Sequence, residues 1–145
     1  MDITKLPFND LIRLEACDPG LDREALLRLP DHPRYTNHLG TLHAAALFSL
    51  AEASSGLYLW RNVGAAADSV LPVVRRADIK YRKPAEGSVW ARGKSESSDW
   101  EKFHADLVKR GRALISFQIE VLSDTEATVA AVATFDWFVT STKAS

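Results

Sequence analysis

The sequence contains very little cysteine and almost no net charge. Cys17 is its only cysteine, and the formal net charge is −1. One cysteine excludes an internal disulfide and a CxxC zinc motif, and it fits a reducing compartment. A charge so near zero does not favour nucleic acid or an anionic membrane as a partner. The first sixteen residues lack the basic and apolar regions of a signal peptide. We therefore expect a cytoplasmic protein with neither kind of partner.

Internal repeats, low-complexity segments and linkers are also missing from the sequence. Its 145 residues suit a single domain spanning 1–145, which would bury about two thirds of the surface of the unfolded chain. Apolar residues make up 46% and charged residues 26%, which is ordinary for a globular protein.

The most informative segment that is present runs from Leu42 to Trp60, is mostly apolar or small, and contains one carboxylate, Glu52. Its serines and its carboxylate favour a core helix, buried nearly all round, over a membrane span. Burying an unpaired carboxylate costs several kcal/mol, so two interpretations remain open. Glu52 is a catalytic base, or it is a structural carboxylate satisfied by a hydroxyl or by Arg75 or Arg76.

Local signals predict the helices. Thr41 is a suitable N-cap for the helix that begins at about Leu42 and runs to near Trp60, before Gly64. A second helix is predicted over Asp99–Arg110, because Phe103, Leu107 and Val108 recur at helical spacing. Ser98 or Asp99 could cap it, and Gly111 follows as a stop signal.

Alternation of apolar and polar residues predicts the four longer strands, and the turn signal Asp18-Pro19-Gly20 separates two possible short strands before them. Two short strands are expected near the N-terminus and four longer ones after the central helix: Leu11–Ala16, Ala25–Leu29, Val73–Arg82, Ser88–Ser95, Ala113–Leu122 and Ala127–Thr140. In the third, Val73, Arg75, Ala77, Ile79 and Tyr81 are expected to share one face. A mostly antiparallel sheet around one long helix is an α+β architecture.

The environment of Glu52 on its helix suggests room for a ligand. Ala45, Ser49 and Gly56 lie within about 60° of it on a helical wheel, so a thin group could approach closely. First-turn backbone N–H groups, including that of Ala44, lack helical partners and could stabilise an oxyanion. Ala44 precedes Glu52 by about 12 Å, so a site that uses both requires the two groups to come from different subunits.

Other polar residues are less specific. No HxxxH or HxH spacing points to a metal, and we interpret His43 as a packing or hydrogen-bonding residue at the start of the helix. Seven basic residues are concentrated on two predicted strands: Arg75, Arg76, Lys80, Arg82, Lys83, Arg92 and Lys94. They form either a solvated sheet face or a site for the phosphates of a substrate.

The segment Asn37–Leu47, NHLGTLHAAAL, together with Glu52 resembles the helix motif of hotdog-fold thioesterases of the PaaI and YiiD type. The strand end IKYRKPAEG, Ile79–Gly87, is similar to their Y-x-x-P-x-x-G segment. The resemblance covers roughly residues 25 to 140. It implies the hotdog fold, in which an antiparallel sheet wraps around a long central helix.

The resemblance also implies an activity and a site. It implies an acyl-CoA thioesterase that works as a homodimer or homotetramer and uses no metal or redox cofactor. By position in the motif, Glu52 is the general base or nucleophile, the Ala44 N–H is the oxyanion donor, and Asn37 assists or positions the water. The implied substrate-binding residues are His43, Ala45, Ser55, Gly56 and Arg82. Where the family pattern reads His-Gly-Gly, this chain has His43-Ala44-Ala45.

Two other functions fit the same fold. A non-catalytic hotdog module would bind acyl-CoA or serve as an oligomerisation core, and the two alanines favour it. A dehydratase or hydratase would need a His–acid pair, and His43 points elsewhere on the helical wheel than Glu52. We therefore rank the dehydratase or hydratase lowest.

Overall fold

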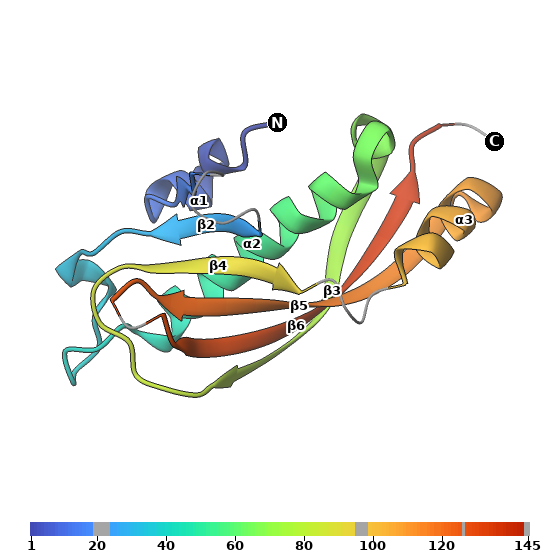
Figure 1. The fold of residues 1–145 in the computed structure, drawn as a ribbon. Helices are drawn as coiled ribbons and strands as arrows, with labels where there is room; N and C mark the ends of the chain where they lie inside the picture. Colours follow the sequence, from blue (N-terminus) through green and yellow to red (C-terminus); the bar gives the residue numbers. More distant parts are fainter. Residues whose placement is uncertain (19–23, 95–98, 126, 144–145) are drawn as a thin grey trace.

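The computed structural model describes residues 1–18, 24–94, 99–125 and 127–143. In chain order the elements are η1 (Ile3–Lys5), α1 (Pro7–Leu11), β1 (Glu15–Ala16), β2 (Ala25–Leu29), η2 (Pro33–Tyr35), α2 (Ala44–Val63), η3 (Gly64–Ser69), β3 (Val70–Tyr81), β4 (Val89–Lys94), α3 (Trp100–Arg110), β5 (Arg112–Ser123) and β6 (Val129–Ser141). Figure 1 shows α2 lying along one face of a curved sheet.

The sheet has six antiparallel strands in the order β1-β2-β4-β5-β6-β3. The long strands β5 and β6 lie next to each other inside the sheet, and their inward side chains alternate as the sequence predicted. Phe117, Ile119, Phe135 and Val139 are at most 1% exposed, and they form the floor on which α2 packs. The architecture is the hotdog fold, so the predicted fold class is confirmed.

Close packing holds α2 against the sheet. The Tyr58 ring lies edge-on to Phe117, with 4.9 Å between the ring centroids. It also lies over Gly93 of β4, where an added Cβ would come within 2.3 Å of the tyrosine ring. Gly93 therefore makes room for an aromatic ring that fixes the position of the helix along its axis.

The central helix differs from its prediction at both ends and on one side. It begins at Ala44, with His43 rather than Thr41 as the N-cap, and it continues to Val63 rather than stopping near Trp60. The His43 Nδ1 accepts a hydrogen bond from the Ala45 N–H at 2.9 Å. The helix is buried toward the sheet, but Ala44 and Ala45 are exposed and Glu52 is only partly buried, so it is not buried all round.

Of the two N-terminal strands expected, the first was wrong over most of its length. The segment expected to be a strand over Leu11–Ala16 is helix α1 up to Leu11 and pairs with β2 only at Glu15–Ala16. Pro7 occupies the first turn of α1, a position that proline favours because it has no N–H to lose. Strand β2 has the predicted bounds.

Two further predictions fail in detail. A register shift between Val74 and Arg76 marks a bulge in β3, which breaks the predicted alternation. As a result Val74, rather than Val73, is the partly buried residue next to Trp137 of β6. Helix α3 has the predicted cap and stop, but Val108 is 89% exposed and is not part of the core.

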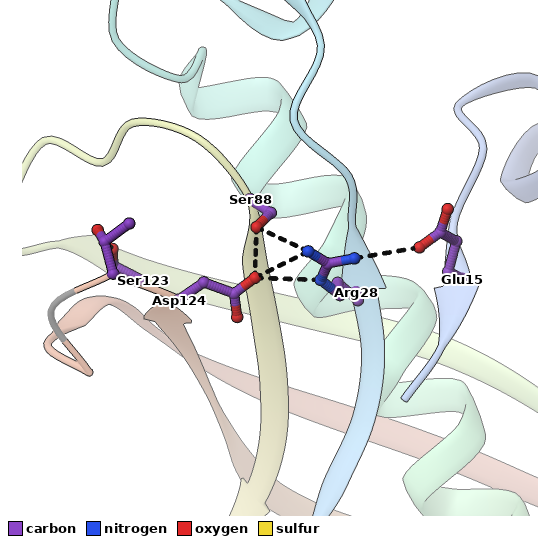
Figure 2. Close-up of polar contacts among 6 residues, drawn as sticks. Glu15, Arg28, Ser88, Ser123 and Asp124 are labelled. Carbon is purple, nitrogen blue, oxygen red and sulfur yellow. Dashed lines mark hydrogen bonds and ion pairs between the residues drawn. The ribbon is translucent and has the colours of Figure 1, made fainter. Parts of the chain in front are cut away.

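Polar contacts connect the strands at the β1 edge of the sheet. Figure 2 shows Arg28 of β2 between Glu15, Ser88 and Asp124. Its guanidinium lies 3.4 Å from the Glu15 carboxylate and 3.0 Å from that of Asp124, and it donates to the Ser88 hydroxyl at 2.9 Å. The single cation links β1 and β2 to the turn after β5. The carboxylates of Glu15 and Asp124 balance the charge of Arg28, which indicates that the cluster is structural.

Candidate functional site

Glu52 lies in the third turn of α2 and lines a hollow of about 540 Å³. The walls of this Glu52 hollow come from the N-terminal segment, the second half of α2, the start of β3 and Trp137 of β6. Among the described residues, none forms a hydrogen bond or an ion pair with the Glu52 carboxylate. The structural interpretation, in which a hydroxyl, Arg75 or Arg76 satisfies this group, is not what the structure shows.

The electrostatic consequence is a carboxyl group that resists ionisation. Burial raises the pKa of Glu52 above its ordinary value, because the charged form loses water without gaining a partner. Arg75, which the sequence offered as a partner, lies instead over the Phe138 ring, 3.9 Å from its centroid. A carboxyl group with a raised pKa in a hollow is suited to accepting a proton nearer neutral pH.

Two neighbours on α2 fix the backbone beside Glu52. The Ser55 hydroxyl is buried, donates to the Glu52 carbonyl oxygen at 2.7 Å, and accepts from the Trp137 indole N–H at 3.1 Å. Ser55 therefore ties the helix to β6 and is not directed at a ligand. An added Cβ at Gly56 would lie 3.4 Å from the Ile3 side chain, so the small-residue stripe is approached by the N-terminal segment of the same chain.

The start of α2 leaves one backbone donor free. The Leu42 N–H donates to the Ala85 carbonyl at 2.8 Å and the His43 N–H to the Tyr35 carbonyl at 2.7 Å. The Ala45 N–H is taken by the His43 side chain. Within the described part of the chain, the Ala44 N–H has no acceptor. It stands at the positive end of the helix dipole, where an oxyanion is stabilised.

Ala44 lines a second hollow, of about 290 Å³, together with Asn37, Tyr81, Arg82 and Lys83. Arg82 and Lys83 are exposed, and neither forms an ion pair with any described residue. The Tyr81 hydroxyl donates to the Ala44 carbonyl oxygen at 3.2 Å. The Ala44 hollow thus combines one free N–H with two cations that have no charge partner.

Asn37 organises the loop that leads to Ala44. Its Nδ2 donates to the Thr41 hydroxyl at 2.9 Å, and its Oδ1 accepts from the N–H groups of Leu39 at 2.9 Å and Thr41 at 3.2 Å. The amide is engaged within its own loop. It therefore positions the chain at the helix start and borders the hollow without being free of partners.

His43 and Ala45 line a third hollow, of about 320 Å³, on the side of α2 nearer to α1. His43 acts there as the helix cap, as its interpretation as a hydrogen-bonding residue predicted. The basic residues also divide: β3 and β4 are separated by β5 and β6, and Arg92 and Lys94 pair with Glu120. Of the basic cluster, Arg82 and Lys83 line the hollow that contains Ala44.

The structure therefore brings Asn37, Ala44 and Arg82 together and places Glu52 with Gly56 in a separate hollow. Sequence reasoning missed Trp137 and the N-terminal wall. The alternation in β6 marked Trp137 as inward-facing, and Pro7 was a signal for a helix start. Within the described ranges, no group of three or more His, Cys, Asp and Glu side chains is placed to hold a metal ion.

No helix among the described residues is both long and apolar enough to cross a membrane. The antiparallel sheet curved around the long central helix places the protein in the class of hotdog-fold proteins. The chain belongs to the family described as "Domain of unknown function (DUF4442)", which matches residues 11–139.

Solved structures of other proteins have the same fold. A protein from Pseudomonas aeruginosa, described as of unknown function and "Probable Thioesterase", is 23% identical with a TM-score of 0.77, over 96% of this chain and 91% of that one. A mutant thioesterase enzyme from Staphylococcus aureus is 11% identical with a TM-score of 0.65, over 93% and 99%. A mutant of the phenylacetic acid degradation protein PaaI from Thermus thermophilus is 19% identical with a TM-score of 0.59, over 92% and 98%. No curated protein matches the sequence significantly.

Proposed function

We propose that this protein is an acyl-CoA thioesterase whose active site is shared between two subunits. The observation that carries the proposal is the Glu52 carboxylate, which has no partner in the described structure and lies in an apolar hollow with a raised pKa. The thioesterase descriptions of the structural neighbours support the same class of reaction. The substrate is a CoA thioester, and the products are CoA and a free acid.

In this mechanism Glu52 acts as general base or as nucleophile. As a base, it removes a proton from water while the water oxygen attacks the thioester carbon, and the proton then goes to the departing CoA sulfur. The Ala44 N–H donates to the carbonyl oxygen as negative charge develops on it. Asn37 supports this step by holding the loop before the helix start. Neither step requires a metal or a redox cofactor.

The two groups act on one carbonyl only if they come from different chains. Along α2 they are eight residues apart, or about 12 Å, and they line different hollows. Strand β3 has twelve residues and lies at the edge of the sheet, where a long unpaired strand is a template for another chain. We propose a homodimer through β3, which could pair further into a homotetramer.

The Ala44 hollow is suited to the CoA portion. Arg82 and Lys83 are exposed cations beside the free N–H, and guanidinium and ammonium groups bind phosphates. Ala45 and His43 border the approach to the helix start. The single cysteine, Cys17, is compatible with the reducing cytoplasm, where we place the reaction.

Mixed dimers test the shared site. Glu52→Gln removes the base, and Ala44→Pro removes the N–H. His43 already has φ −63° and ψ 138°, which suits a residue before proline, and proline is favoured at the first helical position. Each variant alone should lose about 10²–10³-fold or more in kcat with a panel of acyl-CoAs.

Heterodimers that carry one copy of each variant retain one complete site of two. Purified through two different affinity tags, they should recover about half of the wild-type activity. Ala44→Gly keeps the N–H and is the matched control, with a much smaller loss than Ala44→Pro. Full turnover by Glu52→Gln, or inactive heterodimers, would contradict the proposal. Binding of acyl-CoA without hydrolysis by the wild-type protein would favour the non-catalytic module instead.

A further inference from the structure

The lining of the Glu52 hollow favours some acyl groups over others. Its lining is apolar apart from Glu52 itself and Asn9, whose amide Nδ2 donates to the Ile3 carbonyl at 2.9 Å. The indole N–H of Trp137 is already bound to Ser55. A charged or hydroxylated acyl group would lose its hydration there and find few partners, which costs free energy. A plain hydrocarbon loses nothing of that kind and gains from burial.

The hollow is elongated along α2. Glu52, Gly56, Trp60 and Val63 all line it, and they follow one another at helical spacing on one side of the helix. Glu52 and Val63 are eleven positions apart on α2, or about 16 Å at 1.5 Å per residue. An extended hydrocarbon advances by about 1.25 Å per carbon, because C–C bonds are about 1.5 Å long. The stripe is therefore as long as an acyl chain of about thirteen carbons.

The outer wall is the N-terminal segment. Met1, Ile3, Leu6, Pro7 and Phe8 line the hollow opposite α2. Buried Asn9 holds this wall in place through its bond to Ile3. At Gly56 the gap between helix and wall is narrow, since an added Cβ would lie 3.4 Å from Ile3 and 3.9 Å from Trp137. Ile3 therefore packs close to the helix at Gly56 and sets the width of the hollow at this point.

We propose that the Glu52 hollow is the acyl pocket, that its substrates carry unsubstituted medium-chain acyl groups, and that the N-terminal segment sets their length. The inference rests on the proposed thioesterase function, since it uses Glu52 as the group next to the thioester. It adds the substrate class and assigns a specificity-determining role to residues 1–8, most directly to Ile3.

Chain-length kinetics provide the first test. With acetyl- through hexadecanoyl-CoA, kcat/KM should rise about three- to fourfold for each added methylene, from about 0.8 kcal/mol per buried CH₂. It should level off at about twelve to fourteen carbons. Succinyl-CoA and hydroxyphenylacetyl-CoA should be poor substrates. A flat series, or a preference for acetyl, dicarboxylic or hydroxylated acyl groups, would overturn the proposal.

Variants of the wall separate specificity from folding. Ile3→Ala removes carbon atoms from the wall and should lower kcat/KM for decanoyl-CoA by about three- to tenfold. Gly56→Leu fills the gap and should move the optimum to shorter chains. Lys5→Ala, in the same short helix but outside the lining, is the matched control. Equal effects of Ile3→Ala and Lys5→Ala would contradict the role of the wall.

Binding of decan-1-ol distinguishes failure of the pocket from failure of the activity. The tryptophans at 60 and 137 line the hollow, so their fluorescence reports its occupation without any turnover. If the protein hydrolyses no CoA ester yet binds decan-1-ol, and Ile3→Ala weakens that binding, the pocket stands and the proposed activity fails. If it hydrolyses CoA esters without binding decan-1-ol, the activity stands and the acyl pocket is wrong.

Discussion

Two glutamates of this protein occupy opposite electrostatic environments. Glu120 of β5 is 5% exposed and lies between Arg92, 2.9 Å away, and Lys94, 2.8 Å away. Burial alone would raise the pKa of Glu120, but the hydrogen bonds and charges of Lys94 and Arg92 outweigh it and hold the pKa below its ordinary value. Glu52 is less buried, lacks any such partner among the described residues, and has a raised pKa.

The difference shows how to distinguish a structural carboxylate from a reactive one. Depth of burial does not do so, because the more deeply buried Glu120 is the more strongly ionised. The presence of charged partners does distinguish them. Glu120 of β5 forms ion pairs with two cations of β4, whereas Glu52 lines a hollow. An unpaired carboxylate is kept at a cost in stability, which is typical of a functional site.

The largest expected difference between the two glutamates is in catalysis. Glu52→Gln should lower kcat with acyl-CoA substrates by about 10²–10⁴-fold, because the amide cannot accept the proton. Glu120→Gln should leave kcat nearly unchanged, since Glu120 lies on β5 and lines neither hollow of the proposed site. Steady-state hydrolysis monitored by release of the CoA thiol compares them. Equal losses in both variants would remove the distinction.

Stability should show the reverse order. Glu120→Gln leaves Arg92 and Lys94 without their common partner, and we expect it to lower the free energy of unfolding by about 1–3 kcal/mol at neutral pH. Glu52→Gln removes an unpaired charge and should keep or slightly raise that free energy. Urea titrations followed by circular dichroism measure both. A larger loss for Glu52→Gln would mean that Glu52 has a stabilising partner in solution.

Acid should affect the two glutamates in opposite directions. The pKa of Glu120 is lower in the folded state, so its stabilisation is complete above the unfolded value of about 4.3. That stabilisation disappears as the pH falls through the folded pKa. The pKa of Glu52 is raised, so its cost grows as the pH rises from about 4.3 through the folded pKa.

Urea midpoints at a series of pH values check this prediction. The gap between wild type and Glu120→Gln should narrow toward acid. The gap between wild type and Glu52→Gln should widen toward neutral pH. Parallel curves for wild type and either variant would contradict the shift assigned to that glutamate.

The smallest effect comes from giving Glu52 a cation. Ser49 lies three residues before it on α2, so Ser49→Lys places an ammonium group within reach. Such helix pairs are worth about 0.2–0.5 kcal/mol, or roughly 0.2–0.4 pH units at 1.36 kcal/mol per unit. The acid limb of the kcat/KM profile should move down by that amount. Ser49→Gln, similar in length but neutral, is the control, and equal shifts would argue against a charge effect.

Particular elements show how far prediction from sequence succeeded. Strand β2 and helix α3 have the expected bounds within one residue, because a turn signal, a cap and a glycine stop are local signals. The bulge at Arg75 and the exposure of Val108 were missed. Both depend on which surface a side chain meets in three dimensions, and neighbouring residues in the sequence do not specify that.

The sequence by itself determined the α+β class, the central helix and the candidacy of Glu52, since these follow from periodicity and from the cost of burying a charge. Only the tertiary structure decided that Glu52 has no described partner whereas Arg92 and Lys94 belong to Glu120. It also showed that Ala44 has the free N–H and that the N-terminal segment forms a wall of the hollow. Those facts depend on strand order and on contacts between distant segments, and electrostatic pairing is set by such proximity in space.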